Sequence, residues 1–181
     1  FGLRGTNLAF PFYQGESVDA ISSATPLSKM KFDHQFESIS NLLLGNIGGS
    51  LGETCGLILI LCGAYLLYKK IINWRIVASI ILTVMLFSGI FYLIDPTVYP
   101  SPIFMILSGG LLLGTVYMAT DLVTSPLTPK GCWIYGIGIG LLVVLIRLWG
   151  GLPEGMMYAI LLMNAATPLI NRFAKIRTYG H

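Results

Sequence analysis

Trp74–Leu93 reads WRIVASIILTVMLFSGIFYL, and this stretch decides the fold class of the chain. Its only charged residue is Arg75. About 20 apolar residues suffice to cross a bilayer as a helix, so the stretch is long enough to span a membrane. Four further runs have the same character: Ser50–Tyr68, Pro102–Thr120, Gly131–Trp149 and Gly155–Ile170. The sequence therefore predicts an all-α integral membrane protein with about five transmembrane helices.

Composition agrees with this fold class. Hydrophobic residues make up 55% of the 181 residues and charged residues only 10%, and the mean hydropathy is +0.77. A soluble domain would carry about 25% charged residues. The net charge of +3 is spread over the predicted loop ends, which suits a protein in a lipid bilayer and does not indicate nucleic-acid binding. The chain opens at Phe1 without a signal-peptide pattern, and we expect it to be the carboxy-terminal part of a longer protein.

The chain divides into three predicted parts. Residues 1–38 are polar and form an extramembrane loop, residues 39–171 form the transmembrane domain, and residues 172–181 form a cytoplasmic tail. A glycine-rich segment, Gly45–Glu53, follows the apolar stretch Ile39–Leu44. Such a break predicts one discontinuous helix, a device that aims the ends of half-helices at a site.

Basic residues predict the orientation. They crowd the first connection between spans, occur in the third and follow the last span, whereas residues 95–101 have none. The positive-inside rule therefore makes those connections and the carboxy terminus cytoplasmic, and Thr25 then faces the extracytoplasmic side. Arg147 lies within a predicted span, and we expect it to reach the interface by snorkelling. The cytoplasmic set is Lys69, Lys70, Arg75, Lys130, Arg172, Lys175 and Arg177.

The predicted amino-terminal loop carries the heptad Asp19-Ala20-Ile21-Ser22-Ser23-Ala24-Thr25. Ser22, Ser23 and Ala24 are small, and Pro26 pushes Thr25 towards extended backbone. An unhindered threonine hydroxyl of this kind can be brought up to a phosphoanhydride by a transferase. The alternative is structural: Thr25 as the N-cap of a helix, with Pro26 in its first position. The two roles are compatible.

With one substitution, Ser23 in place of glycine, the heptad matches the motif Asp-x-x-Ser/Thr-Gly-Ala-Thr, on which a flavin transferase esterifies the last threonine with FMN. The chain in this respect resembles the RnfD subunit of the Rnf ion-translocating oxidoreductase complex, and its relative, the NqrB subunit of the sodium-pumping NADH:quinone oxidoreductase. The resemblance implies a covalent FMN on Thr25, with Asp19, Ser22, Ser23 and Ala24 as the rest of the acceptor motif.

A second Ala-Thr-Pro-Leu sequence, residues 166–169, repeats residues 24–27. It lacks the upstream aspartate and serines and ends an apolar run. We therefore expect Thr167 to be a helix-end residue and not a second acceptor.

Two acidic positions are candidates for an ion pathway. Glu53 either forms a capping box with Ser50 or belongs to an ion or flavin site, because acidic residues at membrane depth are costly. Asp121 and Thr124 either form a turn or contact a flavin, a quinone-like ring or a cation. The segments around Glu53 and Asp121 both resemble segments of the RnfD family, although Leu122 replaces a proline that is common there.

Other patterns are structural. Gly136 with Gly140, and Gly110 with Gly114, have the spacing of small residues at helix contacts in membranes. The first pair does not form a dinucleotide fingerprint, because it sits inside an apolar span. Three cysteines without a Cys-x-x-Cys pair are too few for a four-ligand iron–sulfur cluster in this chain. His34 and His181 are isolated, and neither a metal site nor a catalytic residue is predicted.

The resemblance implies a subunit of a bacterial inner-membrane complex that exchanges electrons between ferredoxin and NAD and moves Na⁺ or H⁺. Its partners would be the other Rnf subunits, including a second covalent-flavin subunit, and a flavin transferase during maturation. The chain would relay electrons and would not be active alone; a further, non-covalently bound flavin is left open. The alternatives are the quinone-reductase subunit, a secondary transporter without a redox cofactor, and an assembly or anchor subunit.

Overall fold

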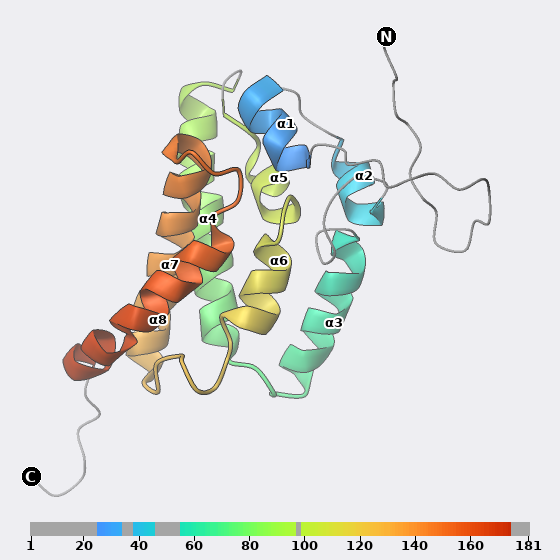
Figure 1. Ribbon diagram of the computed structural model, residues 1–181. Coiled ribbons are helices and arrows are strands. Elements are labelled where there is room, and N and C mark those ends of the chain that lie inside the picture. Colours follow the sequence, from blue (N-terminus) through green and yellow to red (C-terminus); the bar gives the residue numbers. More distant parts are fainter. Residues whose placement is uncertain (1–24, 34–37, 46–54, 97–98, 175–181) are drawn as a thin grey trace, which may run out of the picture.

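The computed structural model describes residues 25–33, 38–45, 55–96 and 99–174, and all regular secondary structure in these ranges is helical (Figure 1). The predicted all-α class is confirmed for them. Along the chain the elements are α1 (Pro26–Asp33), α2 (Ile39–Leu44), α3 (Gly56–Tyr68), α4 (Trp74–Ile94), α5 (Pro102–Leu107), α6 (Leu111–Leu113), the π-helix η1 (Gly114–Met118), α7 (Pro129–Trp149) and α8 (Met156–Phe173).

Two of these helices, α4 and α7, are long and apolar enough to cross a membrane, and α3 is apolar but only 13 residues long. The predicted count of five spans stays a prediction. The third predicted span, Pro102–Thr120, is not one helix: it is divided into α5, α6 and η1, with a break at residues 108–110.

The α4–α7 pair forms the centre of the molecule. Its close approach depends on small residues, because a Cβ added to Gly140 would lie 2.7 Å from Thr83 Cβ and one added to Gly136 would overlap Ser79. The predicted small-residue packing of Gly136 and Gly140 is thus confirmed. Ser79 and Thr83 stay satisfied within α4, since their hydroxyls donate to the carbonyls of Ile76 (3.0 Å) and Ser79 (2.7 Å).

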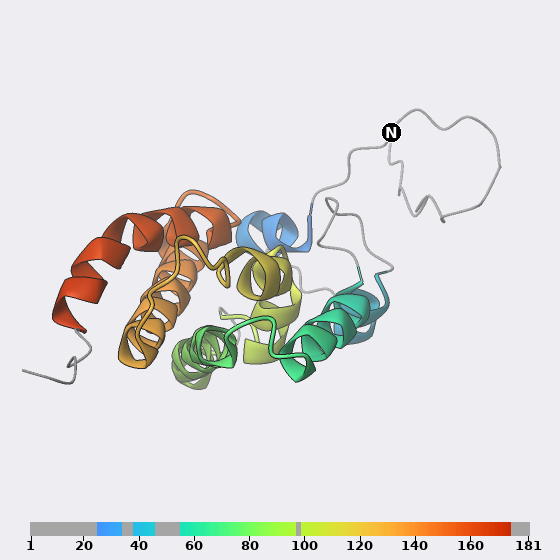
Figure 2. The same cartoon turned by 90° about the horizontal axis from the view of Figure 1, so that it is seen from below.

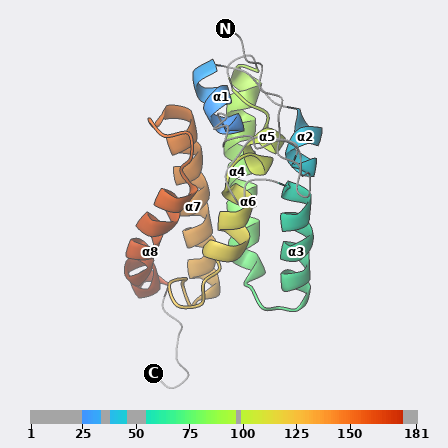
Figure 3. The ribbon, with the colours of Figure 1, turned by 45° about the vertical axis from the view of Figure 1, so that its right-hand side comes forward.

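The other helices flank this pair. α8 packs on α7, while α5 packs on α4. Figures 2 and 3 show α8 at one flank and α3 at the opposite one, with α4, α5 and α6 between them. The main core lies where α4, α7 and α8 meet, and includes Ile80, Tyr135, Ile139 and Ala159.

The predicted discontinuity falls between α2 and α3. α2 ends at Gly45, whose φ of +80° is left-handed, and a Cβ added there would lie 2.7 Å from the backbone nitrogen of Cys55. The two helices therefore meet end to end, as the glycine-rich segment predicts (Figure 1). Residues 46–54 between them, including Ser50 and Glu53, lie outside the described residues.

The two ends of the bundle differ in their basic residues. One end of the bundle holds the last residues of α3 and α8 and the first residues of α4 and α7. Helix α1 lies at the opposite end (Figure 1). Among the described residues, the first end carries Lys69, Lys70, Arg75, Lys130 and Arg172, and α1 carries Lys29 and Lys31.

Candidate functional site

Thr25 begins helix α1. Its hydroxyl oxygen accepts a hydrogen bond from the Ser28 amide (3.3 Å) and lies 3.0 Å from the Ser28 hydroxyl, while its carbonyl accepts from the Lys29 amide. Pro26 follows in the first helical position. This is the N-cap geometry expected from Thr25-Pro26, and the side chain remains only half-buried.

Helix α1 is fixed to the bundle by two sets of contacts. Leu27 is fully buried and packs in one cluster with Leu42 of α2 and Phe104 of α5. One turn later, Lys31 Nζ donates to the carbonyls of Leu152 (2.7 Å) and Ile146 (3.3 Å), beyond and near the end of α7. Burial lowers the pKa of the Lys31 ammonium from its ordinary value of 10.5. Thr25 is thus held at a defined place on the bundle.

A break in the third predicted span lies directly against α1. Ser108 is extended (φ −89°, ψ 143°) and ends α5, and Gly109 is left-handed at φ +67°. A Cβ added to Gly109 would overlap Leu27 of α1. The prediction that Gly110 packs as a small helix residue is therefore wrong, because Gly110 belongs to the break; Gly114 does pack closely, against Met156.

Arg147 of α7 covers the carboxyl end of α5. It is 1% exposed, and its guanidinium donates to the carbonyls of Met105 (2.5 Å) and Ser108 (3.1 Å). A cation is favoured there because the carbonyls at a helix end carry partial negative charge. The prediction that Arg147 snorkels to the interface is wrong: the broken helix offers it unpaired carbonyls inside the bundle.

Glu154 covers the other side of the break. Its carboxylate accepts a hydrogen bond from the Gly110 amide (2.8 Å), immediately before α6. A Cβ added to Gly109 would lie 3.2 Å from Arg147 Nη2 and would overlap Glu154. Opposite charges thus flank the same three-residue break. Sequence reasoning missed Glu154 and the break; the available signals were the Ser108-Gly109-Gly110 run within an apolar segment and two charged residues near the end of an apolar span.

Asp121 and Thr124 lie at the opposite end of the bundle from α1. They precede α7, whereas Lys31 contacts residues at the end of α7; a helix of 21 residues is about 30 Å long. Asp121 is exposed and Thr124 is half-buried, and the Thr124 hydroxyl donates to the Asp121 carboxylate (3.1 Å) within a turn. The structure therefore does not bring them to Thr25, and any role in contacting another ligand or an ion stays a prediction.

The other predicted site residues lie in α8 or outside the described part of the chain. Thr167 lies inside α8, where its hydroxyl donates to the Met163 carbonyl (3.0 Å), so its predicted place at a helix end is wrong. Its role as a non-acceptor stays a prediction. The upstream acceptor positions Asp19, Ser22, Ser23 and Ala24 lie outside the described residues.

The chain belongs to the NQR2, RnfD, RnfE family, whose pattern matches residues 5–180. It is 45% identical over 167 residues to the D subunit of the Na⁺-translocating ferredoxin:NAD⁺ oxidoreductase complex of Acetobacterium woodii, covering 90% of this chain and 50% of that protein. It is 43% identical over 173 residues to the proton-translocating counterpart of Clostridium ljungdahlii, covering 90% of this chain and 52% of that protein.

A third relative is the D subunit of the ion-translocating oxidoreductase complex of Stutzerimonas stutzeri, 41% identical over 184 residues, which cover 96% of this chain and 52% of that protein. The chain thus spans about half the length of the curated relatives it matches.

Proposed function

We propose that this chain is part of a membrane subunit of an Rnf-type ion-translocating ferredoxin:NAD oxidoreductase, and that it relays electrons through FMN esterified to Thr25. The observation that carries the proposal is the acceptor heptad ending at Thr25 in a chain of this family. The position of Thr25 supports it: the hydroxyl is half-buried at the start of a short helix that is itself anchored to the bundle.

The residues around Thr25 suit a phosphoester. Replacing the hydroxyl hydrogen by a phosphoryl group leaves Oγ in place. Among the described residues, the side chain that hydrogen-bonds to this hydroxyl is that of Ser28. The first-turn amides of α1, including that of Ser28, favour a nearby negative charge because they carry no intrahelical partner. The acceptor position is therefore electrostatically compatible with the product of the transfer.

The flavin would supply one- and two-electron chemistry, and this chain would supply position and environment. A phosphoester leaves the ring system untouched, so the ring's potential depends on its non-covalent surroundings. The tether raises the local concentration of the ring to the order of mM. Anchoring of α1 by Leu27 and Lys31 gives that tether a fixed origin.

The wider role follows from the same proposal. The chain works with the other Rnf subunits, among them a second covalent-flavin subunit, in a bacterial inner membrane, and it is inactive by itself. Glu53 and Asp121 are proposed to affect ion coupling and not flavin attachment, since Asp121 lies at the end of the bundle opposite α1. The Thr25 end is proposed to face the extracytoplasmic side.

The test of the proposal is the mass of the peptide that contains Thr25. In protein made with an active flavin transferase, we expect FMN on that peptide and flavin fluorescence that stays with the denatured polypeptide. Thr25→Ala should abolish both, and Thr25→Ser should retain the hydroxyl needed for attachment. Thr167→Ala is the matched control, because residues 166–169 repeat residues 24–27, and it should keep full loading. An unmodified Thr25 peptide would refute the assignment.

A secondary transporter is the second candidate, because discontinuous helices such as α5–α6 are typical of transporter sites. In this chain, however, the ends of α5 and α6 at the break are already bonded by Arg147 and Glu154. The names of the relatives favour the Rnf complex over the quinone-reductase subunit. Absence of flavin from the denatured polypeptide would favour the transporter.

A further inference from the structure

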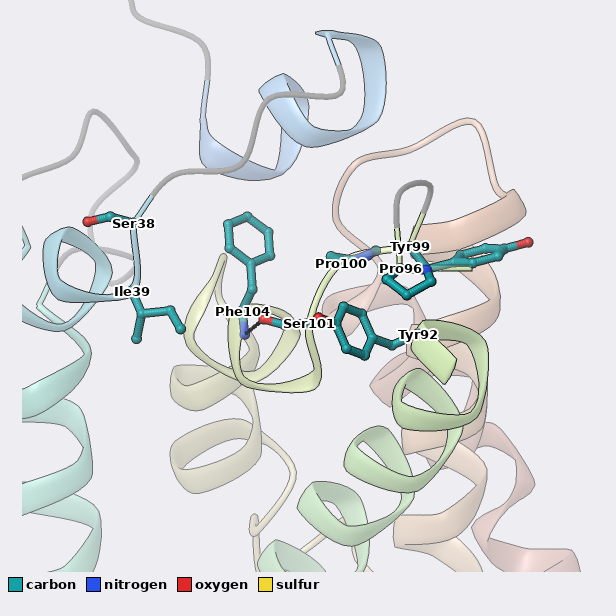
Figure 4. A pocket seen from close by; sticks show the side chains of 8 residues that line it. All are labelled: Ser38, Ile39, Tyr92, Pro96, Tyr99, Pro100, Ser101 and Phe104. Atoms are coloured by element: carbon teal, nitrogen blue, oxygen red, sulfur yellow. Dashed lines mark hydrogen bonds between the residues drawn. The ribbon is translucent and has the colours of Figure 1, made fainter. Parts of the chain in front are cut away.

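A cavity of about 380 Å³ opens beside α1, in the size range of about 300–1,000 Å³ that is usual for ligand sites. Three aromatic side chains line it, Tyr92 of α4, Tyr99 of the following connection and Phe104 of α5, together with Ile39 of α2. Figure 4 shows Ile39, Phe104 and Tyr92 beneath α1, whereas the Tyr99 ring points away from these three side chains. The lining is thus aromatic and apolar, and it comes from three helices and one connection.

The cavity is next to the start of α1. Leu27, two residues after Thr25, packs in one cluster with Phe104, which lines the cavity, and with Leu42, three residues after Ile39. The first turn of α1 therefore rests on the two elements, α2 and α5, that form one side of the cavity. A group tethered to Thr25 begins its reach at this rim.

The two tyrosines of the lining differ in how available their rings are. The Tyr99 ring points away from the opening (Figure 4) and lies 5.5 Å from the Phe91 ring, and Phe91 in turn meets Trp149 edge to face at 4.9 Å. These separations are those of favourable aromatic pairs. Tyr92, in contrast, is 37% exposed, so a face of its ring remains available to a second aromatic system.

Polar groups at the rim suit a ring with one polar edge. The Ser101 hydroxyl, which caps α5 by accepting from the Phe104 amide (3.3 Å), lines the cavity, whereas the Ser38 hydroxyl points away from it (Figure 4). The Tyr92 hydroxyl adds a group that both donates and accepts. A planar, largely apolar ring with hydrogen-bonding groups along one side matches this combination.

We propose that this cavity holds the isoalloxazine ring of the flavin tethered to Thr25, stacked on Tyr92. The inference rests on the proposed function and extends it, because it assigns the residues that surround the ring. An apolar aromatic site penalises charged forms of the ring and so shifts its potential relative to a ring in water. The tether makes docking intramolecular, which keeps the ring in the cavity between electron transfers.

The experiment compares flavin fluorescence in the natural full-length protein, loaded by a flavin transferase, before and after denaturation. A phenol ring stacked on a flavin quenches its fluorescence by electron transfer, so the native signal should be low and should recover on denaturation. Tyr92→Leu should raise the undocked fraction roughly twofold to tenfold, the effect of losing one aromatic pair. Tyr92→Trp, which keeps an electron-rich ring, should restore quenching.

The matched control is Tyr68→Leu, the same change at a tyrosine that is 82% exposed at the end of α3, far from α1. It should leave the ratio of native to denatured fluorescence unchanged. If the Tyr92→Leu variant carries covalent flavin but keeps the wild-type ratio, docking in this cavity is refuted while the attachment stands. If the denatured wild-type protein carries no flavin, the attachment itself is refuted, so the two failures are distinguishable.

Discussion

Gly109 is the residue on which the break between α5 and α6 depends. Its φ of +67° lies in the left-handed region that side chains with a Cβ rarely adopt. A Cβ there would also overlap Leu27 of α1 and the carboxylate of Glu154. Backbone conformation and packing therefore select glycine independently, and both link the break to the helix that begins at Thr25.

We expect Gly109→Ala to destabilise the protein by about 1–3 kcal/mol, because it adds backbone strain and displaces packed neighbours. The measurement is the thermal unfolding midpoint in detergent. Gly151→Ala is the control: it has the same chemistry, but nothing lies within 4 Å of the added Cβ. Equal midpoints for the two variants would show that the break tolerates a side chain.

At the scale of the element, one arginine substitutes for the missing helical hydrogen bonds of a broken helix. The carbonyls of Met105 and Ser108 would lack donors where α5 stops, and Arg147 supplies them from α7. Glu154 does the same for the Gly110 amide. The break is therefore kept by charged groups from distant parts of the sequence.

Arg147→Met should cost about 1–3 kcal/mol for each carbonyl left without a donor, because the buried group then loses its hydrogen bond without gaining water. Arg147→Lys should recover only part of this, since an ammonium lacks the planar fork of the guanidinium. Arg172→Met, at an exposed position near the end of α8, is the control and should change the unfolding midpoint little. A loss no larger than that of the control would contradict the role assigned to Arg147.

The sequence predicts an element well where neighbouring residues determine it, and poorly where residues distant in the sequence do. The long apolar run alone places α4 and α7 within two residues, and the Thr-Pro and Ser-Pro pairs at residues 25–26, 101–102 and 128–129 mark helix starts. The break at residues 108–110 has no such local cause. Glycines in an apolar run equally suit helix packing, and only contacts with Arg147 and Glu154, some 40 residues away, decide between the two.

The candidate site, too, can be predicted from the sequence only in part. The heptad and the N-cap role of Thr25 can be read from adjacent residues. The aromatic cavity cannot, because Ile39, Tyr92 and Phe104 are far apart in the sequence and meet only through the packing of α2, α4 and α5. The sequence also leaves Asp121 a candidate for a flavin or ion contact, whereas the structure places it before the start of α7, with α1 at the end of that helix.

At the scale of the whole molecule, the two ends of the bundle have different properties. One end gathers α1, the break and the aromatic cavity; the other gathers the turn at Asp121 and most of the described basic residues (Figures 1 and 4). The central helices that separate the ends are each about 30 Å long. The flavin proposed for Thr25 would therefore exchange electrons with partners on the α1 side, or with a second carrier inside the complex.

We expect the basic end of the bundle to face the cytoplasm. Lys69, Lys70, Arg75 and Lys130 share one end of the bundle, and short loops rich in lysine and arginine remain cytoplasmic. In a protein whose native cysteines are replaced by serine, a membrane-impermeant maleimide should label Gly151→Cys in intact cells, since that position is exposed near the contact between Lys31 and Leu152. Lys69→Cys should react only after the membrane is opened, because its loop lies at the basic end. Labelling of Lys69→Cys but not Gly151→Cys in intact cells would invert the orientation and place Thr25 on the cytoplasmic side.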